Sequence, residues 1–442
     1  MRIHLKVLIQ FAGLSVFCLG TVFYLTGCQT AQSAGVTPLS KACAIALAAP
    51  SGTTKLDEEI SKWQQKSKTT NLEAGKISLE QLGWKFIEKA RISNDPGFFQ
   101  LAASCAECIQ SKSDQPSPEA MLLRGHALHQ MHRFLEAEPL ARELVKARGL
   151  AFDFGLLGDV LMEQGKLKEA IDAYQKMMDQ KPNMQAYTRA AHVRWLQGDI
   201  NGAVALSTLA ARSGSPQDRE ATAWVYSKLA YYFLYQHKTN EAKATLGSAL
   251  QWQPEYAPAL LLKGKILMSE GNFAEAVPAL KRAAELNPLT EYHWALAEAL
   301  RGNGNESEAQ ATEAKMSQDD SRTLSLFYAT RNVNQPKALS LVTEELKLRQ
   351  DVYTWDALAW AQFAAGNFTE AETSINKALA EKTQDARFFL HAAVINSHLG
   401  NQKIADKFFE RATTNQHMLL PSERNTLQRE AVNLTHNKKS QG

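Results

Sequence analysis

Apolar residues recur at helical spacing along most of the chain, most clearly in the stretch 151–183. Two short helices are predicted there, each with one apolar face. The apolar positions are Leu157, Gly158 and Leu161 in the first helix, and Ala170, Tyr174 and Met177 in the second. Gly165 marks the turn between the helices, and Pro182 ends the unit because proline lacks the N–H that a continuing helix needs. The small residues Gly158 and Ala170 indicate that the two helices approach closely.

The same unit recurs along the chain, with an alanine at one position of every second helix. These alanines are Ala137, Ala170, Ala203, Ala242, Ala276, Ala309, Ala338, Ala371 and Ala405. Eight of the nine are preceded, twelve residues earlier, by Gly or Ala, and the exception is Leu326. The pattern resembles the tetratricopeptide repeat, a helix–turn–helix unit of about 34 residues. The resemblance covers 118–417 and implies an all-α superhelical solenoid of about nine to ten helix pairs with a concave groove.

The N-terminal part of the chain reads as an export signal. Arg2 and Lys6 precede a mainly apolar stretch that ends at Tyr24. The sequence Leu25-Thr26-Gly27-Cys28 then resembles the bacterial lipoprotein box, which implies cleavage after residue 27 and a lipid on Cys28. Gln29 after the cysteine implies sorting to the outer membrane in enteric-type bacteria. The alternative is an uncleaved anchor in the inner membrane, although the apolar stretch is short for spanning.

Composition divides the rest of the chain. Residues 28–76 are rich in Ser, Thr, Ala, Gln and Lys and are predicted to be a tether, with a short helix conceivable at Leu56–Lys66. A divergent helix pair is predicted in 77–117, the repeats in 118–417, and a capping helix with a polar tail in 418–442.

Charge and cysteine content narrow the function classes. The net charge of +3 and the aromatic content of 8% do not favour a nucleic-acid-binding protein, which would have a strong excess of basic residues or aromatic residues that stack on bases. Three cysteines lie beyond Cys28, and this odd number does not predict a disulfide framework. Cys105 and Cys108 are predicted to be packed residues of one helix, with a redox pair or a metal half-site as alternatives. No protease, esterase or nucleotide-binding motif occurs, so we expect neither an enzyme nor a cofactor.

Aromatic residues recur at first-helix positions that face the groove in the tetratricopeptide family. They are Trp195, Trp224, Tyr231, Trp294 and Trp360. Exposed aromatic residues are common anchors of protein recognition, so these residues are candidates for binding a partner. The alternative is that they pack as core between neighbouring first helices.

A second candidate site is polar. His126, Asp159 and His192 occupy the same first-helix position in successive units, and His129 lies nearby. These side chains are candidates for a polar contact with a partner. Such a cluster could instead hold a divalent metal, or form a solvated ladder on the groove wall.

The sequence therefore predicts a non-catalytic protein–protein interaction scaffold. The resemblances imply a lipoprotein of the bacterial outer membrane that faces the periplasm and presents its groove to a protein of an envelope complex. Two alternatives stay open: a periplasmic protein that binds a metal or small ligand through the His/Asp cluster, and a regulatory subunit of a cell-wall enzyme.

Overall fold

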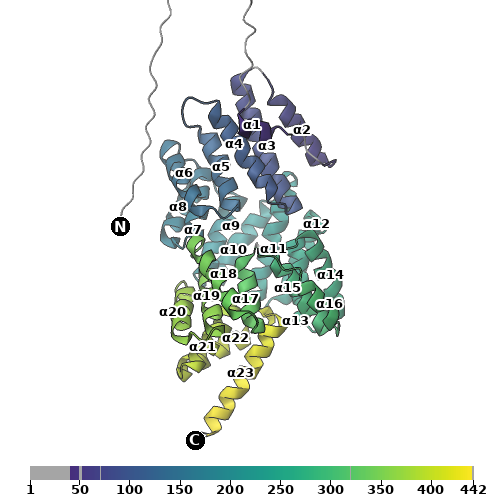
Figure 1. Ribbon diagram of the computed structural model, residues 1–442, viewed down its shortest axis with the longest axis vertical. Coiled ribbons are helices and arrows are strands. Elements are labelled where there is room, and N and C mark those ends of the chain that lie inside the picture. Colours follow the sequence, from purple (N-terminus) through teal and green to yellow (C-terminus); the bar gives the residue numbers. More distant parts are fainter. Residues whose placement is uncertain (1–39, 49–51, 70, 319, 441–442) are drawn as a thin grey trace, which may run out of the picture. The chain divides into compact units, whose positions relative to one another are not determined.

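The protein is described by a computed structural model that covers residues 40–48, 52–69, 71–318 and 320–440, with side chains to residue 431. Within these ranges all regular structure is helical, as predicted (Figure 1). None of the described helices combines the length and hydrophobicity needed to cross a membrane. The predicted leader and Cys28 lie outside the described residues.

Among the residues described from position 40 onward, four helices precede the regular repeats: α1 (Lys41–Ala46), α2 (Lys55–Lys66), α3 (Leu72–Ser93) and α4 (Gly97–Ser111). Helix α2 begins at a capping box in which Thr54 accepts from the Asp57 N–H and Asp57 accepts from the Thr54 N–H. Ile60 of α2 is fully buried in a core shared with α3 and α4. The tether prediction is therefore wrong for residues 40–48 and 52–69, because α1 and α2 supply apolar side chains to this core.

A disulfide joins Cys43 of α1 to Cys108 of α4 across 65 residues, with the two Cα atoms 4.8 Å apart. The prediction of two packed, unpaired cysteines is wrong for Cys108, because α1 packs on α4 and brings Cys43 to it. Cys105 is buried and free. Burial raises the pKa of its thiol well above the usual range.

Nine helix pairs follow, and each contains one of the repeated alanines in its second helix. The pairs are α5 (Pro118–Gln130) with α6 (Phe134–Ala147), α7 (Ala151–Glu163) with α8 (Leu167–Gln180), α9 (Met184–Leu196) with α10 (Ile200–Arg212), α11 (Arg219–Tyr235) with α12 (Thr239–Trp252), α13 (Ala257–Ser269) with α14 (Phe273–Leu286), α15 (Thr290–Gly302) with α16 (Glu306–Glu313), α17 (Ser321–Arg331) with α18 (Gln335–Leu348), α19 (Val352–Ala364) with α20 (Phe368–Leu379), and α21 (Ala386–His398) with α22 (Gln402–Thr414). A 3-10 turn, η1 (Pro216–Asp218), fills the longer loop before α11.

The small residues act as the pattern predicted. All nine repeated alanines are fully buried. A Cβ added at Gly158 would collide with the ring of Tyr174 in the partner helix. In the exceptional pair, where Leu326 replaces the small residue, Ser325 Oγ donates a 2.8 Å hydrogen bond to the Ala338 carbonyl and joins α17 to α18.

The first helices of the pairs form one side of the array, here called the first-helix face, and distant pairs meet on it. Trp195 Nε1 of α9 donates to the Tyr353 hydroxyl of α19 at 2.8 Å. Close by, the Gln350 N–H donates to the Glu163 carbonyl at 2.9 Å. The Thr383 hydroxyl likewise donates to the Leu196 carbonyl at 2.8 Å. The groove implied by the family resemblance is therefore partly filled by the chain itself.

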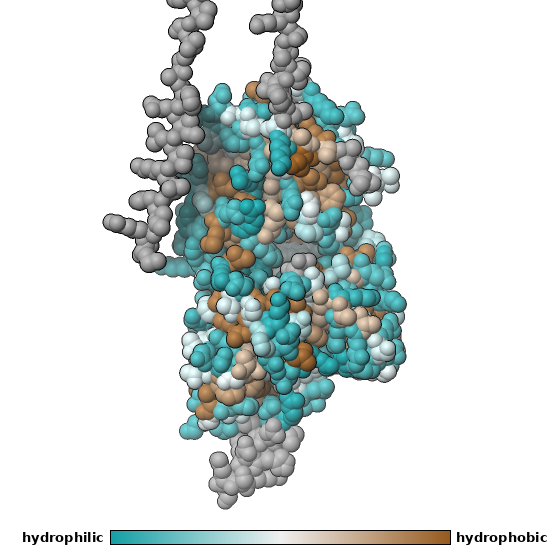
Figure 2. All heavy atoms as spheres, in the orientation of Figure 1, coloured by the Kyte–Doolittle hydropathy of each residue, from teal (hydrophilic) through white to brown (hydrophobic). Residues whose placement is uncertain are grey.

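The chain continues into η2 (Gln416–Met418), which contacts α13, and the helix α23 (Pro421–Ser440), which packs against α21 and α22 (Figure 1). Figure 2 shows mostly hydrophilic residues on the visible face, with hydrophobic residues in small separate groups.

Candidate functional site

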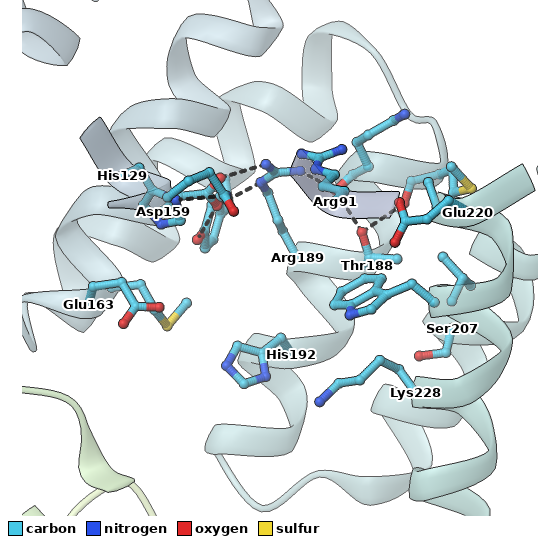
Figure 3. A pocket seen from close by; sticks show the side chains of 18 of the residues that line it. Arg91, His129, Asp159, Glu163, Thr188, Arg189, His192, Ser207, Glu220 and Lys228 are labelled. Atoms are coloured by element: carbon cyan, nitrogen blue, oxygen red, sulfur yellow. Dashed lines mark hydrogen bonds and ion pairs between the residues drawn. The ribbon is translucent and has the colours of Figure 1, made fainter. Parts of the chain in front are cut away.

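One candidate site on the first-helix face is a cavity of about 560 Å³, here called the α9–α11 cavity (Figure 3). Residues of α3, α5 and each helix from α7 to α11 line it. The polar and aromatic residues among them are Arg91, His129, Gln130, Asp159, Glu163, Tyr174, Gln185, Thr188, Arg189, His192, Ser207, Glu220, Trp224, Lys228 and Tyr232. Three of the four residues predicted as a polar site, His129, Asp159 and His192, line this cavity, together with Trp224.

Asp159 is engaged by two neighbours. Arg189 Nε and Nη2 donate to the two carboxylate oxygens at 2.7 and 2.6 Å, and the Tyr174 hydroxyl donates to Oδ1 at 2.9 Å. Burial alone would raise the pKa of Asp159, but the Arg189 guanidinium outweighs burial and lowers it. Asp159 is therefore a charged group that ties α7 to α9, and its partner is Arg189 rather than either histidine.

The three predicted histidines have different surroundings. His126 packs edge-on against the Trp84 ring, with 5.3 Å between centroids, and does not line the cavity. Burial lowers the pKa of His126 to about 3 and that of His192 to about 4, so both rings are neutral at pH 7. Burial also lowers the pKa of His129. Among the described side chains, no group of three His, Cys, Asp or Glu is placed to hold a metal ion, so the geometry does not support the metal alternative.

The predicted aromatic anchors divide into core and surface residues. Trp195 and Trp294 are each 1% exposed and Trp360 is 5% exposed, so a partner cannot reach these indole rings in this structure. Tyr231 is half-buried and packs against Trp195 with 5.5 Å between centroids. These four residues fit the core alternative. Trp224 is different, since it is 40% exposed and lines the α9–α11 cavity.

Three basic residues of the site were missed in the sequence, Arg91, Arg189 and Lys228. Lys228 is half-buried, and its Nζ lies 5.2 Å from the centroid of the Tyr231 ring. No ion pair to Lys228 is found among the described residues. Burial lowers the pKa of its ammonium group. The sequence spacing could have indicated Lys228 as a site residue, because it follows Trp224 by four residues and therefore shares its helix face.

A second cavity of about 380 Å³ adjoins the first and shares Met162, Glu163 and His192 with it. Arg349 Nε lies 2.7 Å from Glu163 Oε2 and closes an ion pair between α7 and the chain just after α18. Burial raises the pKa of Glu163, while Arg349 acts to lower it. The second cavity thus lies where α7 and α9 meet the distant helices α17, α19 and α20.

The fold and the site together define a helical-repeat protein with a recessed, polar surface between first helices. Two sequence models of the tetratricopeptide repeat match the chain, one over residues 122–185 and one over residues 233–300. The chain is a tetratricopeptide repeat protein. This architecture typically binds proteins and is typically non-catalytic.

Solved structures of low sequence identity are similar to parts of the chain. One is PilF of Pseudomonas aeruginosa, with 16% identity over 44% of this chain and 88% of that chain and a TM-score of 0.38. Two others are monomeric mutants of IFIT1, one with m7Gppp-AAAA and one with Gppp-AAAA, each with 15% identity over 77% of this chain and 71% of that chain and a TM-score of 0.36. No curated protein matches the sequence.

Proposed function

We propose that this chain is a non-catalytic interaction scaffold, lipid-anchored at Cys28 in the outer membrane of a bacterial envelope and facing the periplasm. Its partner is a protein subunit of an envelope complex, which binds at the α9–α11 cavity. The observation that carries the proposal is the position of Trp224, a large aromatic side chain that is 40% exposed at a cavity. Tryptophan residues next to a recess are enriched among the residues that dominate binding energy.

The surroundings of Trp224 support binding rather than catalysis. Asp159 is held by Arg189 and Tyr174, and is therefore not placed as a free general base. Other charged side chains at the cavity, those of Arg91, Glu220 and Lys228, can orient the polar groups of a partner around the aromatic anchor.

The proposed compartment draws support from the disulfide. Cys43 and Cys108 form a disulfide. Structural disulfides persist in the periplasm and are rare in the reducing cytosol. The lipid anchor rests on the sequence Leu25-Thr26-Gly27-Cys28 after the apolar leader.

The test is affinity purification of the full-length protein from membranes of its host, with mass spectrometry of the proteins retained. The test variant is Trp224→Ala. The matched control is Leu209→Ala on α10, because Leu209 is similarly exposed, at 43%, but does not line the cavity. We expect a membrane or periplasmic protein that the wild type and Leu209→Ala retain and Trp224→Ala loses. Equal recovery by all three proteins would contradict the proposed site. The identity of the retained protein also decides whether the client is a cell-wall enzyme.

A further inference from the structure

The segment 415–427 lies on the first-helix face of the middle pairs, in the place that the family resemblance assigns to a partner. His417 Nε2 of η2 donates to the Leu234 carbonyl of α11 at 3.0 Å. Met418 packs against three separate core clusters, which otherwise hold different groups of pairs. Leu419 and Leu420 are buried beside it. The apolar part of the segment thus fills a junction between pairs.

The beginning of α23 is held by charges from two other first helices. Glu423 receives a 2.5 Å bond from Arg387 Nε of α21 and also accepts from the Leu420 N–H at 2.8 Å. The Ser422 N–H donates to Glu298 Oε2 of α15 at 3.0 Å. A carboxylate at this position stabilises the helix N-terminus through its exposed N–H groups and its dipole. Arg387 and Glu298 therefore hold the first turn of α23, and Glu298 also accepts from Trp294 Nε1 at 3.1 Å.

Arg424 adds a contact to a third first helix. Its Nη2 donates to the Met268 carbonyl at 3.0 Å, and its Nη1 lies 3.4 Å from the Ser269 carbonyl, at the end of α13. Carbonyls at the end of a helix lack the usual partners within the helix, and this guanidinium adds donors there beside the Gly271 N–H, which donates to the Met268 carbonyl at 3.2 Å. Four first helices, α11, α13, α15 and α21, thus bind one segment through side-chain and backbone groups.

These contacts are concentrated in one short part of the segment. Gln428 and Arg429, the two residues after the buried Leu427, are exposed. The polar groups of α11, α13, α15 and α21 that bind residues 415–427 can also bind a segment of another protein that carries the same side chains.

We propose that residues 415–427 are a built-in ligand of the first-helix face, and that a partner segment of the same chemistry displaces them. Such a segment has three consecutive apolar residues in place of Met418, Leu419 and Leu420. It continues into a helix whose first turn offers a carboxylate to Arg387 and a guanidinium to the end of α13. This surface is separate from the α9–α11 cavity, so the two proposals stand or fall independently.

The experiment keeps both parts of the protein present. A protease site is inserted between Thr414 and Asn415, at the end of α22, and the folded protein is cleaved there without denaturant. A fluorescent synthetic peptide of residues 415–431 is then added, and its uptake is followed by anisotropy while circular dichroism monitors helix content. We expect the peptide to replace the cleaved fragment with unchanged helix content in the body.

Two peptide variants give the specificity, while the body of the protein stays unchanged. Glu423→Gln removes the charge that Arg387 binds and should weaken uptake by tenfold or more. Arg429→Gln also removes one charge, at a side chain that is 68% exposed, and should bind like the wild-type peptide. The proposal is overturned if the fragment never exchanges, if its departure melts the body, or if the Glu423→Gln peptide binds as well as the wild type.

Discussion

Arg189 and Asp159 are joined by two hydrogen bonds of 2.7 and 2.6 Å, which bridge the first helices of consecutive pairs. Both side chains are mostly buried, and the Tyr174 hydroxyl donates a further bond to the same carboxylate. Repeat arrays are stabilised mainly by contacts between neighbouring units, so this three-residue group ties the α7–α8 pair to the next one. It also forms one wall of the α9–α11 cavity.

Replacing Asp159 with Asn should therefore destabilise the protein. The guanidinium of Arg189 would lose its anionic partner, at a cost of about 2–3 kcal/mol for a hydrogen-bonded charged group. The measurement is the free energy of unfolding by urea. Asp172→Asn is the control, because Asp172 is an exposed carboxylate on α8. Equal stability of the two variants would show that the Arg189 pair contributes little.

Stability should fall as the pH is lowered from 7 to 4. The pKa of His126 is about 3 and that of His192 about 4 in the folded protein, while an unfolded histidine titrates near 6.5. Between these values the unfolded chain binds more protons, so acidification favours unfolding. Urea unfolding at several pH values measures this slope. His126→Phe keeps an aromatic ring against Trp84 and should reduce the slope, and an unchanged slope would contradict the assignment of a neutral, buried His126.

Removal of the disulfide should act locally. Either Cys43→Ser or Cys108→Ser removes the disulfide that closes a loop of 65 residues. A disulfide of this kind contributes about 2–4 kcal/mol to the free energy of unfolding. We expect faster amide hydrogen exchange in α1 and α2, with little change in the pairs from α7 onward, because units of a repeat array contact mainly their neighbours. Cys105→Ala serves as the control that leaves the bond intact. Uniformly faster exchange through all the pairs would contradict a local role.

Two glycines should respond in opposite directions to the same substitution. Gly158→Ala places a Cβ against the Tyr174 ring and should destabilise by about 1–3 kcal/mol. Gly247→Ala on α12 meets nothing within 4 Å and should stabilise by about 0.5–1 kcal/mol, because alanine loses less backbone entropy in a helix. Thermal unfolding of both variants checks this pair of predictions, and the same sign for both would refute the close packing of α7 on α8.

Much of the fold could be predicted because the repeat pattern is local. The spacing of the alanines from Ala137 to Ala405 predicted which side chains of the second helices are buried. The predictions that were wrong concern features that depend on contacts between residues far apart in the sequence. The Cys43–Cys108 bond joins residues 65 positions apart, one of them in a segment whose polar composition favoured a tether.

The candidate site was predicted in part for the same reason. The positions of Trp195 and Trp224 within their first helices indicate that both lie on a similar side of the array. These positions do not indicate whether residues of another helix pair bury the two side chains. Tyr353 of α19 covers Trp195, and no such cover buries Trp224. The spacing placed Asp159 correctly on the cavity wall, whereas its bond to Arg189, thirty residues away, needed the structure.

The most direct test of the proposed function is site-specific photocrosslinking in membranes of the host. A photoreactive phenylalanine analogue is placed at position 224 in one full-length variant and at position 209 in another, both exposed to a similar degree. We predict one discrete crosslinked protein from position 224 and none from position 209, with the crosslink competed by excess unlabelled wild-type protein. The same products from both positions, or none from position 224 while the protein is folded and membrane-bound, would contradict the α9–α11 cavity as the docking site.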